Sequence, residues 1–578
     1  MQKSKLQIKM NNLPSAEQNF LKQRPLAFWL ILVILLTIPS FTTLLQPGYF
    51  GHHDDLQIFR IYQMDKCFRD GQIPCRWVPD MGYGFGYPLF NFYPVMPYYL
   101  GEFIHLFGFS LIVSVKILAI LSFLVSGITM FLLGRFLWGN LGGLVSSMFF
   151  VYAPYHAVDI YVRGAFAEAW SLAFTPAVFL MIAKVVREPS LKNIILLAIF
   201  SALFLTSHNP MALIFTPLMV VWAGIFIVIN DGSSSKKYRS IPKLILGGVW
   251  GLGLAAFFTV PVLVEGKLVH LETLFIGYFN YLAHFISLPQ MFISRFWGWG
   301  GSIWGPDDGM PFQIGYLHWG GILLAIPLAL ILWFKDKLRS IILVYLVLVF
   351  WLAAFLMHPR SNPIWEKVTI LQTLQFPWRI LAVVIFTSSL AVGGFFYGTK
   401  RKSLLLIFLI ALFFGIHIFY REYFRIERSV PLTDKEKLSG ALLDLQRTAG
   451  IFDYLPQTAK FPPGKGAKEE IEVISGYISQ KSFTRGTNWL QAEIEATSTA
   501  TLRLPIFDFP KWRVFIDKNE VKFDNQNDLG QPTFEISVGS HTIYAKLYDT
   551  PVRKIANLIS LISLSVLGYF LFKKWKKH

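Results

Sequence analysis

The sequence contains about twelve separate runs of roughly 20 mostly apolar residues, the length that a helix needs to cross the hydrocarbon core of a bilayer. The runs lie at residues 26–46, 111–133, 140–158, 168–186, 192–208, 211–229, 243–264, 316–334, 340–357, 378–398, 403–420 and 555–572. Only 15% of the residues are charged, against about 25% in ordinary soluble domains. We therefore predict a polytopic α-helical membrane protein with about 12 transmembrane helices. The first run is too long for a removable signal peptide and has no small-residue cleavage site, so we expect it to be an anchor.

The net charge of +18 raises the question of a polyanionic partner. Nearly half of the Lys and Arg residues fall in the N-terminal segment, in the alternate connections on the same side, and in the C-terminal tail, where few acidic residues accompany them. Basic residues in short loops mark the cytoplasmic side of a membrane protein. The charge is thus explained by topology, and we expect both termini in the cytoplasm and no nucleic-acid partner.

The predicted spans divide the chain into four parts. Residues 1–25 form a cytoplasmic N-terminus, and residues 26–420 form the transmembrane domain with extracytoplasmic loops at 47–110 and 265–315. Residues 421–553 form an extracytoplasmic β-rich domain, and residues 554–578 form the last helix and a basic tail. Strands are predicted at 471–480, 489–497, 500–505, 511–517, 532–538 and 541–548, which suits a small β-sandwich. This domain is either a carbohydrate-facing module or a passive spacer.

Two histidines and two carboxylates, His52, His53, Asp54 and Asp55, follow the first apolar run directly. A charge inside the hydrocarbon costs several kcal/mol, so we place these residues just outside it, where a lipid-borne substrate and an aqueous acceptor can meet. We expect Asp54 or Asp55 to cap a helix that continues to Phe68 and lies with its apolar face on the membrane surface, and capping alone is the alternative role for these carboxylates.

The rest of the first loop is aromatic and rich in glycine between residues 82 and 94. Trp77 and Tyr83 are candidates for stacking against a sugar or a lipid headgroup, and interfacial anchoring is the alternative. Cys67 and Cys75 lie in the same loop, where they either form a disulfide in an oxidising compartment or remain free.

Further candidates lie at the outer ends of later helices. Arg163, with Glu168 close by, can hold a phosphate bidentately or can simply fix a helix end through an ion pair. His208 and Arg379 lie on the same side, and snorkelling of the arginine is the structural alternative. Asp307, which precedes Asp308, either contributes to a divalent-cation site or belongs to a turn.

The order of the motifs resembles a large group of bacterial membrane proteins labelled "6-pyruvoyl-tetrahydropterin synthase-related". The shared motifs are the His-Asp-Asp sequence, Arg76-Trp77, Gly82-Tyr83-Gly84, Pro88-Leu89-Phe90, Tyr93-Pro94, Arg163-Gly164-Ala165 with Glu168, His208-Asn209-Pro210, Phe376-Pro377-Trp378-Arg379 and Pro510-Lys511-Trp512 with Asp517. The label itself is misleading, because a pterin synthase is a small soluble zinc enzyme and this chain has no histidine cluster of that kind. The group in turn resembles the GT-C superfamily of membrane glycosyltransferases.

That resemblance implies a function at the cell envelope of a bacterium. The protein would sit in the plasma membrane and move a hexosyl or pentosyl group from a polyprenyl-phosphate sugar to an envelope glycan, lipid or protein. The catalytic carboxylate of the first outer loop maps onto Asp54 or Asp55, which the sequence does not separate. Metal use is open, since there is no Asp-x-Asp motif there. A Mg²⁺ or Mn²⁺ ion would be held by Asp54, Asp55, His53 and Asp307.

The expected chemistry is an inverting displacement in which the aspartate takes the proton of the acceptor hydroxyl. Arg163, Arg379 and His208 would stabilise the departing lipid phosphate. Two other classes stay open: a transporter or flippase of lipid-linked saccharides, and a non-catalytic envelope scaffold. A transporter should show internal repeats and charged residues at the middle of its helices, and in this sequence Lys116 is the main ionisable residue inside a predicted span.

Overall fold

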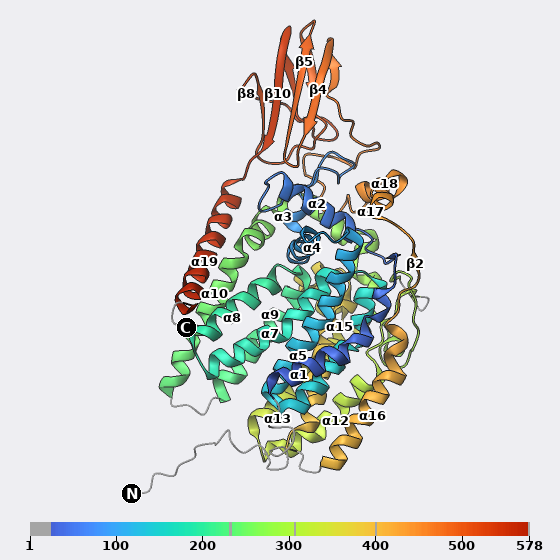
Figure 1. Cartoon of the computed structure of the whole chain (residues 1–578), viewed down its shortest axis with the longest axis vertical. Helices are drawn as coiled ribbons and strands as arrows, with labels where there is room; N and C mark the ends of the chain where they lie inside the picture. Colours follow the sequence, from blue (N-terminus) through green and yellow to red (C-terminus); the bar gives the residue numbers. More distant parts are fainter. Residues whose placement is uncertain (1–24, 230–233, 304, 306–307, 399–401, 576–578) are drawn as a thin grey trace.

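The computed structural model describes residues 25–575 apart from 230–233, 304, 306–307 and 399–401, and shows a helical body joined to a β domain (Figure 1). The predicted N-terminal segment 1–24 and the end of the basic tail, 576–578, lie outside the described residues. In Figure 1 the β domain stands above the helical body, and the helix that follows it, α19 (Pro551–Trp575), returns alongside α10 (Ser234–Glu265).

The helical body agrees with the predicted apolar runs. Besides α10 and α19 it contains α1 (Leu26–Thr37), α5 (Leu111–Val151), α7 (Phe166–Arg187), α8 (Leu191–Leu205), α9 (Asn209–Ile229), α12 (Tyr316–Trp333), α13 (Lys337–Leu356), α15 (Leu381–Val392) and α16 (Lys402–Tyr420). Within the described ranges, eight helices are long and apolar enough to cross a membrane. The chain is therefore a polytopic helical membrane protein, and the number of twelve spans stays a prediction.

Two predicted spans meet in one helical element. Helix α5 is 41 residues long, and its backbone leaves the helical region at Gly139, with φ 85° and ψ −178°. The two halves match the predicted runs 111–133 and 140–158. The first predicted run is helical only to Thr37 and continues as short 3₁₀ turns, so its helix is shorter than predicted.

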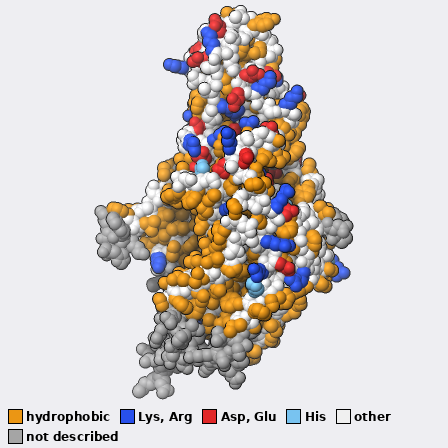
Figure 2. Space-filling model, turned by 45° about the vertical axis from the view of Figure 1, so that its right-hand side comes forward, with side chains coloured by type: hydrophobic (Ala, Val, Ile, Leu, Met, Phe, Trp, Pro, Cys, Tyr) orange, Lys and Arg blue, Asp and Glu red, His pale blue; other side chains and the backbone are white. Residues whose placement is uncertain are grey.

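The surface of the helical body is apolar. Leu263 on α10 is 83% exposed, and Phe334, directly after α12, is 89% exposed. On the face shown in Figure 2, apolar side chains cover much of the helical body, whereas many charged side chains gather on the β domain above it. This division suits a body in lipid and a domain in water.

The first loop is folded into the protein. Its helices α2 (Gln57–Arg69), α3 (Leu89–Phe92) and α4 (Met96–Leu106) lie between the helical body and the β domain (Figure 1). The prediction of an interfacial helix is wrong, because the apolar side chains Ile58, Ile61 and Met64 are buried in the protein core. The capping prediction is also wrong, since the residue before α2 is Leu56 and no side chain caps the helix.

The cysteines of this loop are bonded to each other. Cys67, near the end of α2, forms a disulfide with Cys75, and both side chains are buried. The structure thus contains the paired alternative of the two that the sequence left open, and the disulfide closes the turn after α2.

The β domain has eight strands in two sheets that share one apolar core. The strands are β3 (Glu472–Ser475), β4 (Ile478–Arg485), β5 (Trp489–Ala496), β6 (Ala500–Arg503), β7 (Trp512–Ile516), β8 (Asn519–Val521), β9 (Thr533–Ile536) and β10 (Gly539–Leu547). One sheet has the order β4-β5-β10-β7-β8 and the other β3-β6-β9, as suits the predicted sandwich. The predicted strand 471–480 is two strands, because Gly476 turns the chain at φ 83°.

Polar contacts fix the β domain to the first loop. The Asp70 carboxylate accepts hydrogen bonds from Trp489 Nε1 at 2.9 Å and from the Thr487 amide and hydroxyl at 2.6 Å. Arg485 donates to the carbonyls of Gly84 and Pro79. The domain is therefore docked on the loop through charge-assisted bonds, which are stronger than neutral ones.

A buried ion pair joins the last helix to the body. Arg553 at the start of α19 donates to the Glu265 carboxylate at the end of α10 at 2.8 Å, and Asn91 and Thr550 also donate to this carboxylate. This pairing is needed because an isolated buried charge costs several kcal/mol.

Candidate functional site

A cavity of about 550 Å³ lies where the first loop, the short connections between helices and residues 453–454 meet. Its walls contain six of the residues predicted for the site: His53, Asp54, Arg163, Glu168, His208 and Arg379. These side chains come from segments that are far apart in the sequence, and the fold brings them to one place.

Asp54 lies in the cavity wall, and three neighbouring side chains bond to its carboxylate. Its Oδ2 accepts from Arg60 Nη1 at 2.6 Å, from Gln57 Nε2 at 3.0 Å and from the Tyr93 hydroxyl at 3.4 Å. All three bonds fall on Oδ2. Within the described residues, Oδ1 has no hydrogen-bond partner, so one carboxylate oxygen of Asp54 is left for a ligand.

Asp55 has a different environment, although it is adjacent in sequence. Its carboxylate pairs with Lys437 Nζ at 2.6 Å, and it does not line the cavity. Burial raises the pKa of Asp55, and the bond with Lys437 lowers it in part. The geometry therefore separates the two aspartates, with Asp54 facing the cavity and Asp55 joining the first loop to the segment before the β domain.

Arg163 is held by a buried acidic cluster. Its Nη1 donates to Asp159 at 2.5 Å and to Glu168 at 2.9 Å, and the Tyr155 hydroxyl donates to the other Glu168 oxygen at 2.5 Å. Glu168 is fully buried at the start of α7 and thus orients the guanidinium. The predicted proximity of Arg163 and Glu168 is present, and Asp159 adds a second anion.

Arg379 lies on the other side of Glu168, with its Nε 3.8 Å from the Glu168 Oε2. Its Nη1 donates to the Leu374 carbonyl at 2.7 Å and to Gln375 Oε1 at 3.2 Å. Both Arg163 and Arg379 make their hydrogen bonds through Nη1. Their Nη2 groups have no hydrogen-bond partner among the described residues, which leaves donors for an anion in the cavity.

A glycine turn positions the first-loop acid against the arginine. The amides of His53 and Asp54 donate to the carbonyls of Val162 and Arg163, and Gln57 donates to the Gly164 carbonyl. Gly164 has φ +63°, and a Cβ there would lie 2.3 Å from His52 Nδ1. Only glycine fits this turn, because both the backbone conformation and the space exclude a side chain.

The histidines of the cavity are neutral. Burial lowers the pKa of His208 to about 3, and its Nδ1 has no hydrogen-bond partner within the described part of the chain. Burial also lowers the pKa of His53, whose Nε2 bonds to the Trp299 carbonyl at 2.8 Å. His208 is therefore suited to donating or accepting a hydrogen bond rather than to supplying a positive charge, which corrects its expected role as a cation.

Trp77 and Tyr83 lie outside the cavity. Trp77 is 1% exposed and packs against Phe509 and Trp512 of the β domain. Tyr83 is part of a turn whose backbone bonds to Arg447 and Ala467. Their predicted stacking role has no counterpart in this geometry, because the rings and backbone are used to join the loop to the C-terminal part of the chain.

The predicted metal ligands do not converge among the described residues, where no three His, Cys, Asp or Glu side chains form a group that could hold an ion. Asp54 is compensated by Arg60, Asp55 by Lys437, and His53 bonds to a carbonyl. Asp307 lies outside the described residues. The divalent cation stays a prediction, and no step below depends on it.

The cavity residues that were not predicted include Arg60, Tyr93, Asp453 and Tyr454. Arg60 lies six residues after Asp54 in α2, and Tyr93 belongs to the aromatic motif of the first loop, so both had a local signal. Asp453 and Tyr454 come from the segment between α16 and the β domain and had none.

One part of the cavity wall is apolar. Val262, Leu271, Leu274 and Phe376 are among its lining residues, and the Phe376 ring lies 4.7 Å from the Arg379 guanidinium. Val262 lies in α10, whose outer surface carries exposed apolar side chains. The cavity therefore combines a charged end with a side that suits an acyl or isoprenoid chain.

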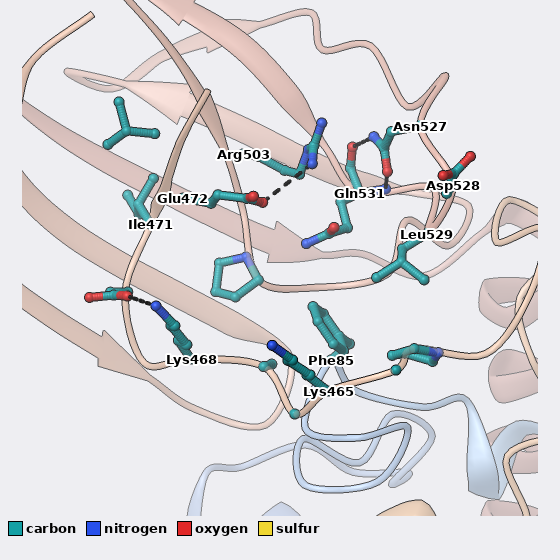
Figure 3. Close-up of a pocket in the computed structure, with 17 residues that line it drawn as sticks. Phe85, Lys465, Lys468, Ile471, Glu472, Arg503, Asn527, Asp528, Leu529 and Gln531 are labelled. Carbon is teal, nitrogen blue, oxygen red and sulfur yellow. Dashed lines mark hydrogen bonds and ion pairs between the residues drawn. The ribbon is translucent and has the colours of Figure 1, made fainter. Parts of the chain in front are cut away.

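A second hollow of about 740 Å³ lies at the edge of the β domain (Figure 3). Phe85 and Lys465 lie on one side of it, and Arg503, Asn527 and Gln531 on the other. Its other cations are paired, Lys468 with Glu470 at 3.0 Å and Arg503 with Glu472 at 3.3 Å. It lacks the buried acids and arginines of the first cavity, so we place the candidate active site in the helical body.

No protein-family model matches the chain. An uncharacterized protein of Lactococcus lactis subsp. cremoris is 22% identical over 377 residues, which are 63% of this chain and 56% of that protein. The chain thus spans about half the length of this curated relative.

Two solved structures show a distant likeness. A mutant of the arabinofuranosyltransferase AftD from Mycobacteria has a TM-score of 0.44 at 13% identity, covering 70% of this chain and 28% of that one. The Archaeoglobus fulgidus oligosaccharyltransferase tethered to an acceptor peptide has a TM-score of 0.40 at 12% identity, covering 70% of this chain and 55% of that one. With TM-scores below 0.5, we draw neither fold nor function from these likenesses.

Proposed function

We propose that this protein is a membrane glycosyltransferase of the GT-C type, which moves a hexosyl or pentosyl group from a polyprenyl-phosphate donor to an envelope glycan, lipid or protein. The observation that carries the proposal is one cavity in which Asp54 faces two arginines, Arg163 and Arg379, next to an apolar wall. The proposed location is the plasma membrane of a bacterium, with the termini in the cytoplasm and the cavity on the extracytoplasmic face.

The acceptor is proposed to bind at Asp54. Its unoccupied Oδ1 accepts a hydrogen bond from a polar group of the acceptor, which orients the attacking oxygen toward the anomeric carbon of the donor. Since Arg60 holds Oδ2, the carboxylate is fixed before the substrate arrives. A single attack from the side opposite the phosphate inverts the anomeric centre.

The leaving phosphate is proposed to bind at the two arginines. The free donors of Arg163 and Arg379 supply positive charge where negative charge develops on the departing oxygen, in a buried site where such charges interact strongly. Glu168 and Asp159 keep the arginines in place, and neutral His208 supplies an additional hydrogen bond. The polyprenyl tail leaves along the apolar wall beside Val262.

The experiment that tests the proposal is sugar transfer by the purified, reconstituted protein. Radiolabelled polyprenyl-phosphate sugars are supplied with envelope extract as acceptor, and wild type is compared with Asp54→Asn and Asp55→Asn. We expect Asp54→Asn to lower the rate by about 100-fold or more, because an amide places the acceptor hydroxyl poorly and leaves Arg60 unpaired.

The matched control is Asp55→Asn, which removes a carboxylate of the same loop that does not reach the cavity. We expect the folded variant to keep the rate within about threefold of wild type, because Asp55 does not line the cavity. Its melting temperature should fall, because the buried Lys437 loses its partner. If the wild type consumes no donor from a broad panel but moves lipid-linked saccharides across vesicles, the protein is a transporter and the proposal fails.

A further inference from the structure

Besides Asp54 and Glu168, the cavity has a third carboxylate, Asp453, which comes from the segment between α16 and the β domain. Its position is fixed by the buried phenol of Tyr87 in the first loop. The Tyr87 hydroxyl donates to the Gly450 carbonyl at 2.6 Å and accepts from the Tyr454 amide at 2.6 Å. The Asp453 amide closes the turn by donating to Gly450 at 3.0 Å. These hydrogen bonds hold a short turn that places the Asp453 carboxylate at the cavity.

Asp453 differs from Asp54 in having no compensating partner. Asp54 is bonded to Arg60, Gln57 and Tyr93, whereas the Asp453 carboxylate makes no hydrogen bond or ion pair with any residue that the structure describes. A half-buried carboxylate in that situation favours binding a proton, because the cavity walls weaken the hydration of its charged form and no cation pairs with it.

The charges facing Asp453 act in opposite directions. Burial raises the pKa of Asp453 to about 6, Arg60 lowers it, and the negative charge of Asp54 raises it. The neighbouring phenols Tyr87 and Tyr454 have pKa values raised by burial, so they remain neutral and do not take up the proton. A general base works best when its pKa lies near the working pH, and Asp453 meets this condition.

We infer that Asp453 is the residue that takes the proton from the attacking hydroxyl of the acceptor, while Asp54, held by Arg60, accepts a hydrogen bond from another polar group of the acceptor and so positions it. The inference rests on the proposed glycosyl transfer and assigns its base to a residue outside the first loop. Two carboxylates in one site thus have different tasks, which their environments set.

The step balances as follows. The acceptor O–H bond breaks and its proton goes to a carboxylate oxygen of Asp453, while the oxygen forms a bond to the anomeric carbon. The bond from that carbon to the phosphate oxygen breaks, and its electron pair stays on polyprenyl phosphate at Arg163 and Arg379. Asp453 then returns the proton to water, which resets the site.

The test is the pH dependence of transfer by the reconstituted full-length protein. In wild type kcat/KM should rise as the pH passes about 6, where Asp453 becomes ionised. We expect Asp453→Asn to lower kcat/KM by about 100-fold or more and to abolish this rise. Asp453→Glu should restore part of the rate and keep a rise at a shifted pH. Asp444→Asn is the matched control, because Asp444 is exposed and does not line the cavity.

Asp54→Asn gives a second, independent readout. The residual kcat/KM of this variant should still rise with pH, but the rise should occur at a lower pH than in wild type. The reason is that the negative charge that opposes ionisation of Asp453 is gone. Should Asp453→Asn fail to fold, the position of the rise in Asp453→Glu and Asp54→Asn decides the question.

The outcomes separate the two proposals. An Asp453→Asn protein that transfers sugar within about threefold of wild type, with the same pH dependence, overturns the inference and leaves the proposed function intact. A wild type that transfers no sugar overturns the proposed function and the inference with it.

Discussion

At the scale of single residues, the site depends on how the arginines are held. Arg163 and Arg379 each bond to the protein through Nη1, and both lie near the buried Glu168. A guanidinium fixed in this way keeps a planar pair of donors, which an ammonium group does not supply. The fork, and not only the charge, should therefore matter for binding a lipid phosphate.

We predict that Arg379→Lys raises the KM for the polyprenyl-phosphate donor by about tenfold, since one of two forked contacts is lost. The measurement is the donor dependence of the initial rate. Arg360→Lys is the control, because Arg360 is exposed in the preceding turn and does not line the cavity. An unchanged KM in Arg379→Lys would show that the fork does not contact the donor.

A second prediction concerns Glu102, a buried residue of α4 whose carboxylate oxygens have no hydrogen-bond partner within the described chain. Burial, aided by Asp65, raises the pKa of Glu102 to about 7. Between its ordinary pKa and pH 7 the folded protein therefore binds more protons than the unfolded one. The contribution of Glu102 to stability falls as the pH rises through this window.

Glu102→Gln should remove this dependence, because the amide does not titrate. Above pH 7 we expect the mutant to melt at a higher temperature than wild type, with a free energy of unfolding larger by up to about 3 kcal/mol. This difference should shrink toward pH 5. Melting in detergent across this pH range checks the prediction, with the exposed Glu469→Gln as control. Parallel melting curves at all pH values would contradict it.

The candidate site could be predicted in part from the sequence. His53, Asp54, Arg163, Glu168, His208 and Arg379 all reach the cavity, because each is a polar residue at the end of an apolar run on the same predicted side. Asp54 and Asp55 were not separable, since their difference is made by Arg60 and Lys437, and Lys437 lies far away in the sequence.

At the scale of elements, the active arrangement depends on a docked turn. Residues 163–165 turn between the short helical segment before them and α7, and the carbonyls of Val162 and Arg163 accept hydrogen bonds from the backbone amides of His53 and Asp54. The left-handed backbone of Gly164 brings the turn against the His52 ring. Gly164 therefore allows the first loop to pack against the turn before α7.

We predict that Gly164→Ala lowers transfer by at least tenfold, because the Cβ meets His52 and pushes Asp54 away from Arg163. Gly71→Ala is the matched control: Gly71 has a similar φ of +71°, but a Cβ there meets nothing within 4 Å. Both variants carry the strain of an alanine at positive φ, about 1 kcal/mol. Equal losses in transfer rate would show that backbone strain, and not the contact with His52, is responsible.

Helices and strands could be predicted from the sequence where the local pattern of residues determines them. The apolar runs became helices because no other backbone satisfies its hydrogen bonds in lipid. Helix α2 was placed wrongly, since an amphipathic pattern does not tell whether its apolar face meets lipid or protein. β8 was missed because it has only three residues, directly after a turn at Asp517 and Lys518.

At the scale of the whole molecule, the proposed orientation places the β domain outside the cell and the connection between α12 and α13 inside. The charge distribution supports this arrangement, because Lys335, Lys337 and Arg339 gather in that connection. The two native cysteines are bonded to each other, so a single added cysteine reports its own exposure.

We predict that Thr499→Cys in the β domain reacts with a membrane-impermeant maleimide in intact cells, whereas Lys335→Cys reacts only after the cells are opened. Both residues are exposed, so access to the thiol depends on the membrane alone. Labelling of Lys335→Cys in intact cells would show that the proposed topology is inverted and that the cavity lies on the cytoplasmic side.

Contacts across the whole chain were the least predictable. Asp453 and Tyr454 reach a cavity made mostly by the helical body, and nothing near them in the sequence indicates this position. The position of Asp453 and Tyr454 is determined by the tertiary fold, which brings the Tyr87 hydroxyl to the turn at Gly450.

The contribution of Asp453 and Tyr454 to the cavity has a consequence for biosynthesis. A ribosome that inserts this chain into the membrane completes most of the helices long before it reaches these two residues. Until the turn at Gly450 has been translated and moved across the membrane, the cavity lacks part of its wall. Truncated and half-inserted chains therefore lack part of the cavity wall, and if Asp453 has the role proposed above, we expect such unfinished copies to be inactive.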